Sequence, residues 1–263
     1  MIADSQGVGI AYEVRGEGEP LVLIHGLAYD RAGWGRLPEL LARSFRVVLL
    51  DNRGVGESDA PEGPYAVSQL AGDTVAVLDA AGIDRAHVFG VSLGGYVAQE
   101  LALTHSDRVA KLVLCSTGPG GPKMHPMPAA GQEAFGRYPA MEREAGLQLM
   151  VENSLGERGV RDVVGLADEI YAYRLEHAPS LAAWQAQAYA GATFDAYDRV
   201  GAISAPTLVL AGGADNVVDP RNAELLGELV PNARVELVPE RGHLLIWEDS
   251  ERVAELVTEF LQS

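Results

Sequence analysis

Two patterns of apolar residues alternate along the chain. Continuous apolar runs predict buried strands, and apolar residues repeated every three or four positions predict helices with one buried face. Predicted strands cover residues 9–16, 21–24, 45–50, 86–91, 111–115, 206–213 and 234–238, and predicted helices cover 30–43, 68–81, 93–102, 221–230 and 253–261. Strands and helices in this order predict an α/β fold, with a mostly parallel central sheet and helices on both of its faces.

The alternation stops between residues 119 and 201. Helical patterns rich in Ala, Glu and Arg, interrupted by Pro and Gly, fill this stretch. We therefore predict a core made of residues 1–118 and 202–263, with a helical insertion at 119–201. Sites in parallel sheets open at the carboxyl ends of the strands. An insertion that leaves from such an end is expected to lie over the site as a cap.

A serine between glycines forms the most informative turn. Gly90 and Gly94 flank Ser92 where a predicted strand meets a predicted helix, and a sharp turn there has no room for a Cβ atom at either glycine. The turn would expose the Ser92 hydroxyl. The backbone N–H of Leu93 opens the helix and would face an oxyanion formed beside the serine. We predict that Ser92 is a catalytic nucleophile.

Two further residues that follow predicted strands can assist Ser92. A Gly-x-Ser-x-Gly turn alone also occurs by chance, and a dinucleotide-binding turn would need glycine at the serine position. Asp215 and His243, however, each come after a predicted strand. A serine hydroxyl needs a base to take its proton, and an imidazole base needs a carboxylate to orient it. We predict His243 as the base and Asp215 as the acid. Asp219 is the competing carboxylate, and Asp195 and Asp198 are more distant alternatives.

The composition of the chain indicates which binding partners and which cellular compartment to expect. The net charge of −17 disfavours nucleic acids and anionic membranes, which would repel the protein. No stretch of eighteen apolar residues or basic leader is evident, so we expect a soluble, cytoplasmic protein. No cluster of His and carboxylate residues has zinc spacing, and we expect no metal or other cofactor. The single cysteine, Cys115, lies in an apolar run and is expected to be a buried thiol.

These motifs resemble the α/β-hydrolase fold family in content and in order. The matching pieces are His25-Gly26-Leu27, Asp51-Asn52-Arg53-Gly54-Val55-Gly56-Glu57-Ser58, Gly90-Val91-Ser92-Leu93-Gly94-Gly95, Gly212-Gly213-Ala214-Asp215 and Gly242-His243. The resemblance implies the order nucleophile, acid, histidine, with a helical cap after the sixth strand. It also implies that the backbone N–H groups of Leu27 and Leu93 form the oxyanion hole. The role that it implies for His25 is loop support rather than proton transfer.

The same resemblance reduces the number of reactions that the protein is expected to catalyse. Epoxide hydrolases and haloalkane dehalogenases use aspartate where this chain has Ser92, and relatives of prolyl aminopeptidase usually carry tryptophan where it has Leu93. We therefore expect a serine hydrolase that cleaves small carboxylic esters. An enol-lactone hydrolase or a cofactor-free perhydrolase on the same triad remains open, as does a ligand-binding protein with a nearly idle site. The expected partner is a small ester or lactone.

Aromatic residues of the insertion are candidates for the substrate pocket. Trp184 and Tyr138 are predicted to line it, because a cap over the carboxyl edge of the sheet would bring them near Ser92. Tyr189 and Phe194 share the same segment. Aromatic residues on an amphipathic helix are more often part of a core, and this alternative applies to all of them.

Overall fold

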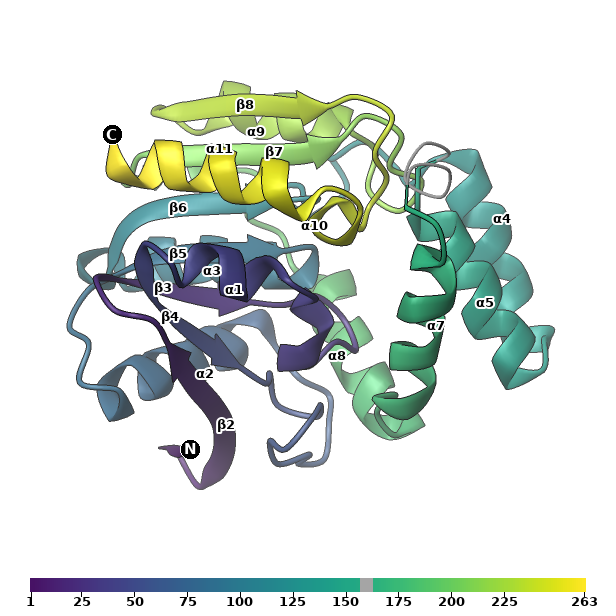
Figure 1. Ribbon diagram of the computed structural model, residues 1–263, viewed down its shortest axis with the longest axis horizontal. Helices are drawn as coiled ribbons and strands as arrows, with labels where there is room; N and C mark the ends of the chain where they lie inside the picture. Colours follow the sequence, from purple (N-terminus) through teal and green to yellow (C-terminus); the bar gives the residue numbers. More distant parts are fainter. Residues whose placement is uncertain (157–162) are drawn as a thin grey trace.

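The computed structural model describes residues 1–156 and 163–263 and contains an eight-stranded sheet (Figure 1). The strands are β1 (Ile2–Ser5), β2 (Val8–Arg15), β3 (Glu19–Ile24), β4 (Phe45–Leu50), β5 (Ala86–Val91), β6 (Val109–Cys115), β7 (Thr207–Gly212) and β8 (Ala233–Val238). Their spatial order is β1-β2-β4-β3-β5-β6-β7-β8. Only the β1–β2 and β2–β4 pairs are antiparallel among these strands, and the others are parallel. The predicted mostly parallel sheet is confirmed.

Helices cover both faces of the sheet. On one face lie α1 (Leu37–Leu41), α10 (Leu245–Glu248) and α11 (Ser250–Gln262), and on the other lie α2 (Val67–Ala80), α3 (Leu93–Thr104) and α9 (Arg221–Leu229). Successive strand residues point to opposite faces. Leu23 therefore packs in the layer of α1 and α11, whereas its neighbour Val22 packs in the layer of α2 and α3. Short 3-10 helices η1 (Arg31–Trp34), η2 (Ser106–Arg108) and η4 (Val200–Ala202) complete this part.

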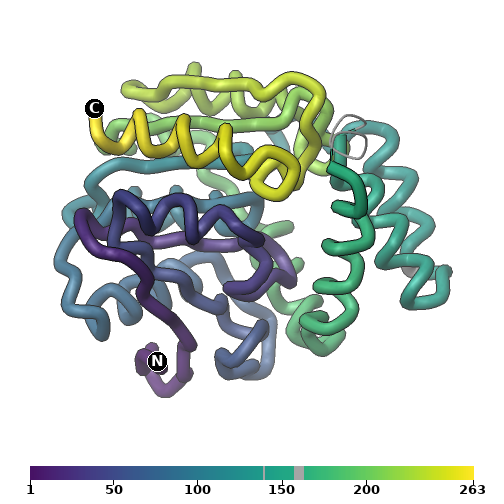
Figure 2. Tube along the Cα trace, viewed as in Figure 1, coloured from purple at the N-terminus to yellow at the C-terminus, as the bar shows by residue number. Residues whose placement is uncertain are grey.

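Residues 119–201 are here called the helical segment, and the described ones, 119–156 and 163–201, follow the carboxyl ends of the parallel strands (Figures 1 and 2). Their described elements are α4 (Ala129–Arg137), η3 (Tyr138–Ala140), α5 (Arg143–Ser154), α7 (Leu166–Glu176) and α8 (Leu181–Thr193). Backbone hydrogen bonds join the two ends of the segment, from Gly121 N to Phe194 O and from Ala196 N to Pro119 O, both 2.9 Å long. The segment thus leaves the sheet and returns to it at neighbouring points. The exact domain boundaries stay a prediction.

Two local expectations were wrong. The single helix predicted over 30–43 is divided into η1 and α1, because Gly35 ends η1 with a positive φ of 55° and Pro38 lies in the first turn of α1. Strand β1 was not predicted. It is short and alternates exposed and buried residues at the sheet edge, so its pattern in the sequence is weak.

Candidate active site

Ser92 lies in a strained turn between β5 and α3. Its φ of 55° and ψ of −118° are unusual for a residue with a side chain. A Cβ atom on Gly90 would lie 2.2 Å from the carbonyl oxygen of Gly94, and a Cβ on Gly94 would lie 2.0 Å from the carbonyl oxygen of Ile24. Both distances are far below van der Waals contact, so a side chain at either position would clash and glycine is required on each side of the serine. The steric reason inferred from the sequence is confirmed.

His243 and Asp215 lie together after strands β8 and β7. The distance from His243 Nδ1 to Asp215 Oδ2 is 2.8 Å, and the Asp215 side chain is buried. The other oxygen of Asp215 accepts hydrogen bonds from the backbone N–H groups of Val217 and Val218, at 2.7 and 2.8 Å. Because an ionised carboxylate is only an acceptor, Nδ1 of His243 carries the proton in this pair. Nε2 is then free to accept a proton.

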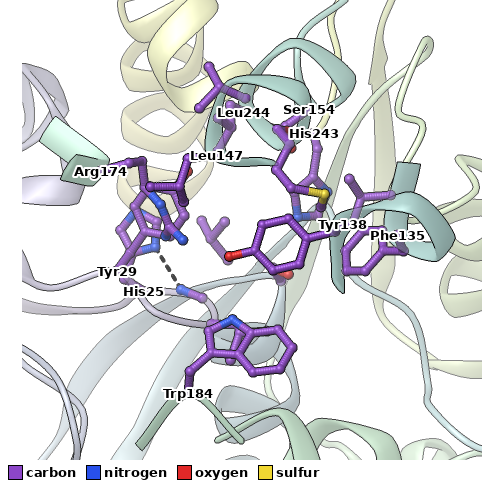
Figure 3. Close-up of a pocket in the computed structure, with 17 residues that line it drawn as sticks. His25, Tyr29, Phe135, Tyr138, Leu147, Ser154, Arg174, Trp184, His243 and Leu244 are labelled. Atoms are coloured by element: carbon purple, nitrogen blue, oxygen red, sulfur yellow. Dashed lines mark hydrogen bonds between the residues drawn. The ribbon is translucent and has the colours of Figure 1, made fainter. Parts of the chain in front are cut away.

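Ser92 and His243 line one cavity of about 130 Å³. Figure 3 shows His243 at the wall of this cavity. Among the described residues no hydrogen bond joins the Ser92 hydroxyl to His243. Such bonds are often long in the absence of substrate. The serine, the histidine and the buried carboxylate therefore converge at the carboxyl edge of the sheet, as the sequence predicted.

Two backbone N–H groups border the nucleophile. Leu93 is the first residue of α3, so its N–H has no acceptor one turn earlier. Leu27 lines the cavity in the loop after β3, and its N–H donates no hydrogen bond within the described part of the chain. A Cβ atom on Gly26 would lie 3.0 Å from Ser92 Cβ, so this loop approaches the serine closely. Leu27 and Leu93 thus approach Ser92 from the loop after β3 and from α3, and their role as an oxyanion hole stays a prediction.

His25 supports the loop that carries Leu27. Its Nε2 donates to the carbonyl oxygen of Gly33 at 2.8 Å, and its Nδ1 accepts from the N–H of Gly26 at 2.7 Å. Burial lowers the pKa of His25 to about 3. The ring is therefore neutral at physiological pH, and both of its nitrogens are already engaged. This geometry agrees with the expectation that His25 is not the base.

Side chains of the helical segment form much of the cavity wall. Trp184 of α8, Tyr138 of η3 and Arg174 of α7 face the space in Figure 3. The remaining lining from this segment is mostly apolar and includes Phe135, Leu147, Met150 and Val151. The structure thus places both predicted pocket residues, Trp184 and Tyr138, at the cavity. Tyr189 is instead exposed, and Phe194 is buried against the ring of Tyr96, with centroids 4.7 Å apart.

The competing carboxylates lie elsewhere. Asp219 pairs with Arg221 at 2.6 Å, and this hydrogen bonding lowers the pKa of the Asp219 carboxyl. Asp198 pairs with Lys123, also at 2.6 Å. Asp215 is therefore the carboxylate in contact with His243. In residues 1–156 and 163–263, no group of three or more His, Cys, Asp or Glu side chains is arranged to hold a metal ion.

Cys115 is buried beneath the serine turn. Its carbonyl oxygen accepts from the backbone N–H of Ser92 at 2.9 Å, which fixes the turn to β6. Burial raises the pKa of the Cys115 thiol to about 12. The thiol is therefore protonated at neutral pH, and the expectation of an inert, buried cysteine is confirmed.

Sequence reasoning missed two buried side chains that fasten the catalytic loops. Glu248 accepts from the N–H of Gly242 at 2.8 Å and from the N–H of Gly156 at 3.2 Å, so it joins the histidine loop to the helical segment. Gln187 of α8 hydrogen bonds to the backbone of Ala28 and Arg53. Polar residues on a helix ordinarily face solvent, and no local pattern marks these two as buried.

The chain belongs to the α/β-hydrolase fold family, whose model matches residues 19–250. A 2-hydroxy-6-oxononadienedioate/2-hydroxy-6-oxononatrienedioate hydrolase of Cupriavidus pinatubonensis is 33% identical over 264 aligned positions, which cover 92% of this chain and 86% of that protein. A thermophilic esterase from Thermogutta terrifontis has a TM-score of 0.85 and 29% identity, over 100% of this chain and 97% of the other. Est816, an N-acyl homoserine lactone degrading enzyme, has a TM-score of 0.85 and 28% identity, over 99% of this chain and 100% of the other. The protein is a hydrolase, and it is similar to enzymes that act on small molecules.

No helix in the described residues is both long enough and apolar enough to cross a membrane.

Proposed function

We propose that this hydrolase cleaves small carboxylic esters through an acyl-enzyme on Ser92. The observation that carries the proposal is the 2.8 Å hydrogen bond between His243 and the buried Asp215, in the cavity wall that also holds the strained Ser92 turn. A serine, a neutral imidazole and an orienting carboxylate are the groups that acyl transfer requires. The similar proteins include an esterase, which agrees with this reaction class.

The reaction proceeds in two half-reactions. His243 Nε2 takes the Ser92 proton as Oγ attacks the ester carbonyl carbon, and the N–H groups of Leu27 and Leu93 stabilise the oxyanion. The tetrahedral intermediate collapses, and the alcohol leaves with the proton from His243. Water then gives a proton to His243 and attacks the acyl-enzyme. Collapse of the second intermediate releases the acid and returns the proton to Ser92, while Asp215 stabilises each imidazolium.

The helical segment acts in this proposal as a cap that selects the acyl group. Its apolar side chains and the rings of Tyr138 and Trp184 face the cavity, whereas the serine turn contributes Val91 and Ser92 to the wall. A cavity of about 130 Å³ suits a small acyl chain. Longer chains would have to displace side chains of the cap.

Labelling with a fluorophosphonate tests the nucleophile directly. The reagent should modify Ser92, with the phosphonyl group located by peptide mass spectrometry, and a series of aryl esters should be hydrolysed. Ser154 provides a matched control, because it lines the same cavity but donates its hydroxyl to the carbonyl of Met150 at 2.7 Å. Ser154→Ala should retain the label and Ser92→Ala should lose it. Labelling of Ser92 without turnover of any ester or lactone would instead favour a ligand-binding protein.

A second candidate substrate is a lactone or ester that carries a carboxylate. The guanidinium carbon of Arg174 lies 4.4 Å from the ring centroid of Tyr29, at the cavity wall, and no described carboxylate forms an ion pair with Arg174. One of its guanidinium nitrogens, Nη1, donates to the carbonyl oxygen of Ala28 at 3.0 Å, and the positive charge can still attract an acidic acyl group. The Cupriavidus relative is named for a dienedioate, which is an acid of this kind.

Matched substrates separate the candidates. Aryl esters of butyrate and of succinate differ mainly by a terminal carboxylate, and Arg174→Gln should lower kcat/KM for the succinate ester at least tenfold more than for the butyrate ester. An equal loss for both would remove the acidic substrate from consideration. Addition of hydrogen peroxide to the same assays, with peracid detection, tests the perhydrolase alternative.

A further inference from the structure

Gln187 of the helical segment binds the loop that carries Leu27. Its side chain is completely buried. The amide oxygen Oε1 accepts from the backbone N–H of Ala28 at 2.9 Å, and Nε2 donates to the carbonyl oxygen of Arg53 at 2.8 Å. A glutamine from α8 thus spans two loops at the carboxyl edge of the sheet. Ala28 directly follows the proposed oxyanion residue.

Ala28 has a conformation that needs support. Its φ of 63° lies in the left-handed region, which is unfavourable for a residue with a Cβ atom. Its carbonyl oxygen accepts from Arg174 Nη1 at 3.0 Å, so side chains of the helical segment bind both polar groups of Ala28. Without Gln187, the N–H of Ala28 would be buried without a partner. Relaxation of Ala28 toward an ordinary φ would rotate the peptide between Leu27 and Ala28. The backbone torsions of Leu27 would pass this change on to the preceding peptide, which carries the Leu27 N–H.

We infer that Gln187 is a positioning residue for the oxyanion hole: its hydrogen bond to Ala28 holds the Leu27 N–H in the direction of the nucleophile. The inference rests on the proposed function. It gives the helical segment a second task, because the segment then orients a backbone donor that stabilises the transition state in addition to lining the pocket. A donor that shifts by about 1 Å can lower turnover roughly a hundredfold.

If Gln187 had a purely structural role, its replacement would have a different effect on kcat. In that case its loss would lower stability without a specific effect on kcat. Asn222 is the matched control, because it is also fully buried and also bridges backbone groups. Its Nδ2 donates to His125 O at 2.9 Å, and its Oδ1 accepts from His125 N at 2.8 Å. These bonds attach α9 to residues near the start of the helical segment, and they do not involve the Leu27 loop.

The test compares Gln187→Met with Asn222→Leu, since both remove a buried amide and keep much of its volume. We expect Gln187→Met to lower kcat roughly tenfold to hundredfold with KM changed less than about twofold, and to slow fluorophosphonate labelling of Ser92 to a similar extent. Asn222→Leu should lower the melting temperature comparably but leave kcat within about twofold. An unchanged kcat in Gln187→Met, or an equal loss in both variants, would overturn the positioning role.

Gln187→Glu provides a second measurement if the methionine variant does not fold. A neutral glutamic acid can accept from Ala28 N–H and donate to Arg53 O, whereas the ionised form cannot donate. Two charged side chains lie beside these contacts. Arg174 donates to the carbonyl oxygen of Ala28, and the side chain of Arg53 forms an ion pair with Asp73 at 2.6 Å. The ratio of variant to wild-type kcat should therefore fall as pH rises, and a constant ratio near one would contradict the inference.

The same experiment distinguishes the two proposals. If wild-type Ser92 is not labelled and no ester is hydrolysed, the proposed function fails, and the positioning role fails with it. If the wild type is labelled and active while the Gln187→Met variant reacts equally fast, only the positioning role fails.

Discussion

The loops at the strand ends and the helical segment differ in what holds them in place. Every residue of β5 is buried, and the turn after it is shaped by glycines that leave no room for any other residue. In the helical segment, α5 and α7 pack in a small separate apolar cluster, formed by Val151, Leu155, Leu166, Ile170 and Leu244, whereas Ala186 and Ala190 of α8 are buried in the main core. The strand before Ser92 is therefore a fully buried support for the turn, whereas α5 and α7 pack around a smaller cluster of their own.

This difference suggests a division of labour. In the proposed mechanism, the strand-end loops carry the catalytic groups, whose positions must not vary, and the segment carries the side chains that select the substrate. The division is incomplete, because Leu244 of the apolar cluster directly follows His243, and because Gln187 and Gly156 bind the catalytic loops. Mutations in the two regions should separate rate from selectivity.

Replacement of the nucleophile should have the largest effect. Ser92→Ala should lower kcat for aryl esters by three orders of magnitude or more, because the acyl-enzyme cannot form. The fold should persist, since the alanine keeps the Cβ atom that the turn accommodates. Ester hydrolysis and circular dichroism measure both outcomes. Turnover close to wild type in a folded Ser92→Ala protein would refute the mechanism.

Replacement of the orienting carboxylate should come next. Asp215→Asn should lower kcat by up to about four orders of magnitude with little change in KM, because the amide can favour the wrong tautomer of His243. Asp219→Asn is the control and should have little effect, since Asp219 pairs with Arg221. The reverse ranking of the two variants would assign the role to the other carboxylate.

Glu248, which joins the His243 loop to the helical segment, should make the stability of the protein depend on pH. Burial raises the pKa of Glu248 to about 7, although the N–H groups of Gly242 and Gly156 oppose this shift. A carboxyl whose pKa is higher in the folded protein binds its proton more tightly there, so its contribution to stability is complete below pH 4.5 and is lost as pH rises through about 7.

Glu248→Gln removes this titration and keeps an oxygen that can accept both N–H groups. The free energy of unfolding of the variant relative to wild type should therefore increase from pH 5 to pH 8, by at most on the order of 3 kcal/mol. Denaturant unfolding at several pH values provides the measurement. A difference independent of pH would show that Glu248 does not titrate in this range.

Changes in the pocket wall should have the smallest effect on rate. Trp184→Ala and Tyr138→Ala should shift kcat/KM among acetyl, butyryl and octanoyl aryl esters toward longer chains by roughly tenfold, because truncation widens the cavity. Labelling of Ser92 should be largely unchanged. An unchanged chain-length preference in every such variant would place selectivity in the loops after β3 and β4.

The sequence by itself determined the α/β class and pointed to Ser92, Asp215 and His243 as the candidate triad. Continuous apolar runs are a local signal of buried parallel strands, and the glycines around Ser92 reflect a steric limit within a few residues of chain. Asp215 and His243 could be chosen because functional groups in such sheets follow strand ends. The division of the helix at 31–41 was missed, because the apolar periodicity continues through Gly35. The backbone does not continue as a helix there, since Gly35 has a positive φ that ends η1.

Only the tertiary structure decided which distant residues support the site. Gln187 and Ala28 are separated by 159 positions, and Gly156 and Glu248 by 92, so no local periodicity relates them. The position of Arg174 was also not predictable from its sequence neighbourhood, which is typical of a surface helix. In the structure Arg174 lines the cavity. Burial of a polar side chain depends on which backbone groups the rest of the chain brings to it, and long-range packing alone supplies those partners.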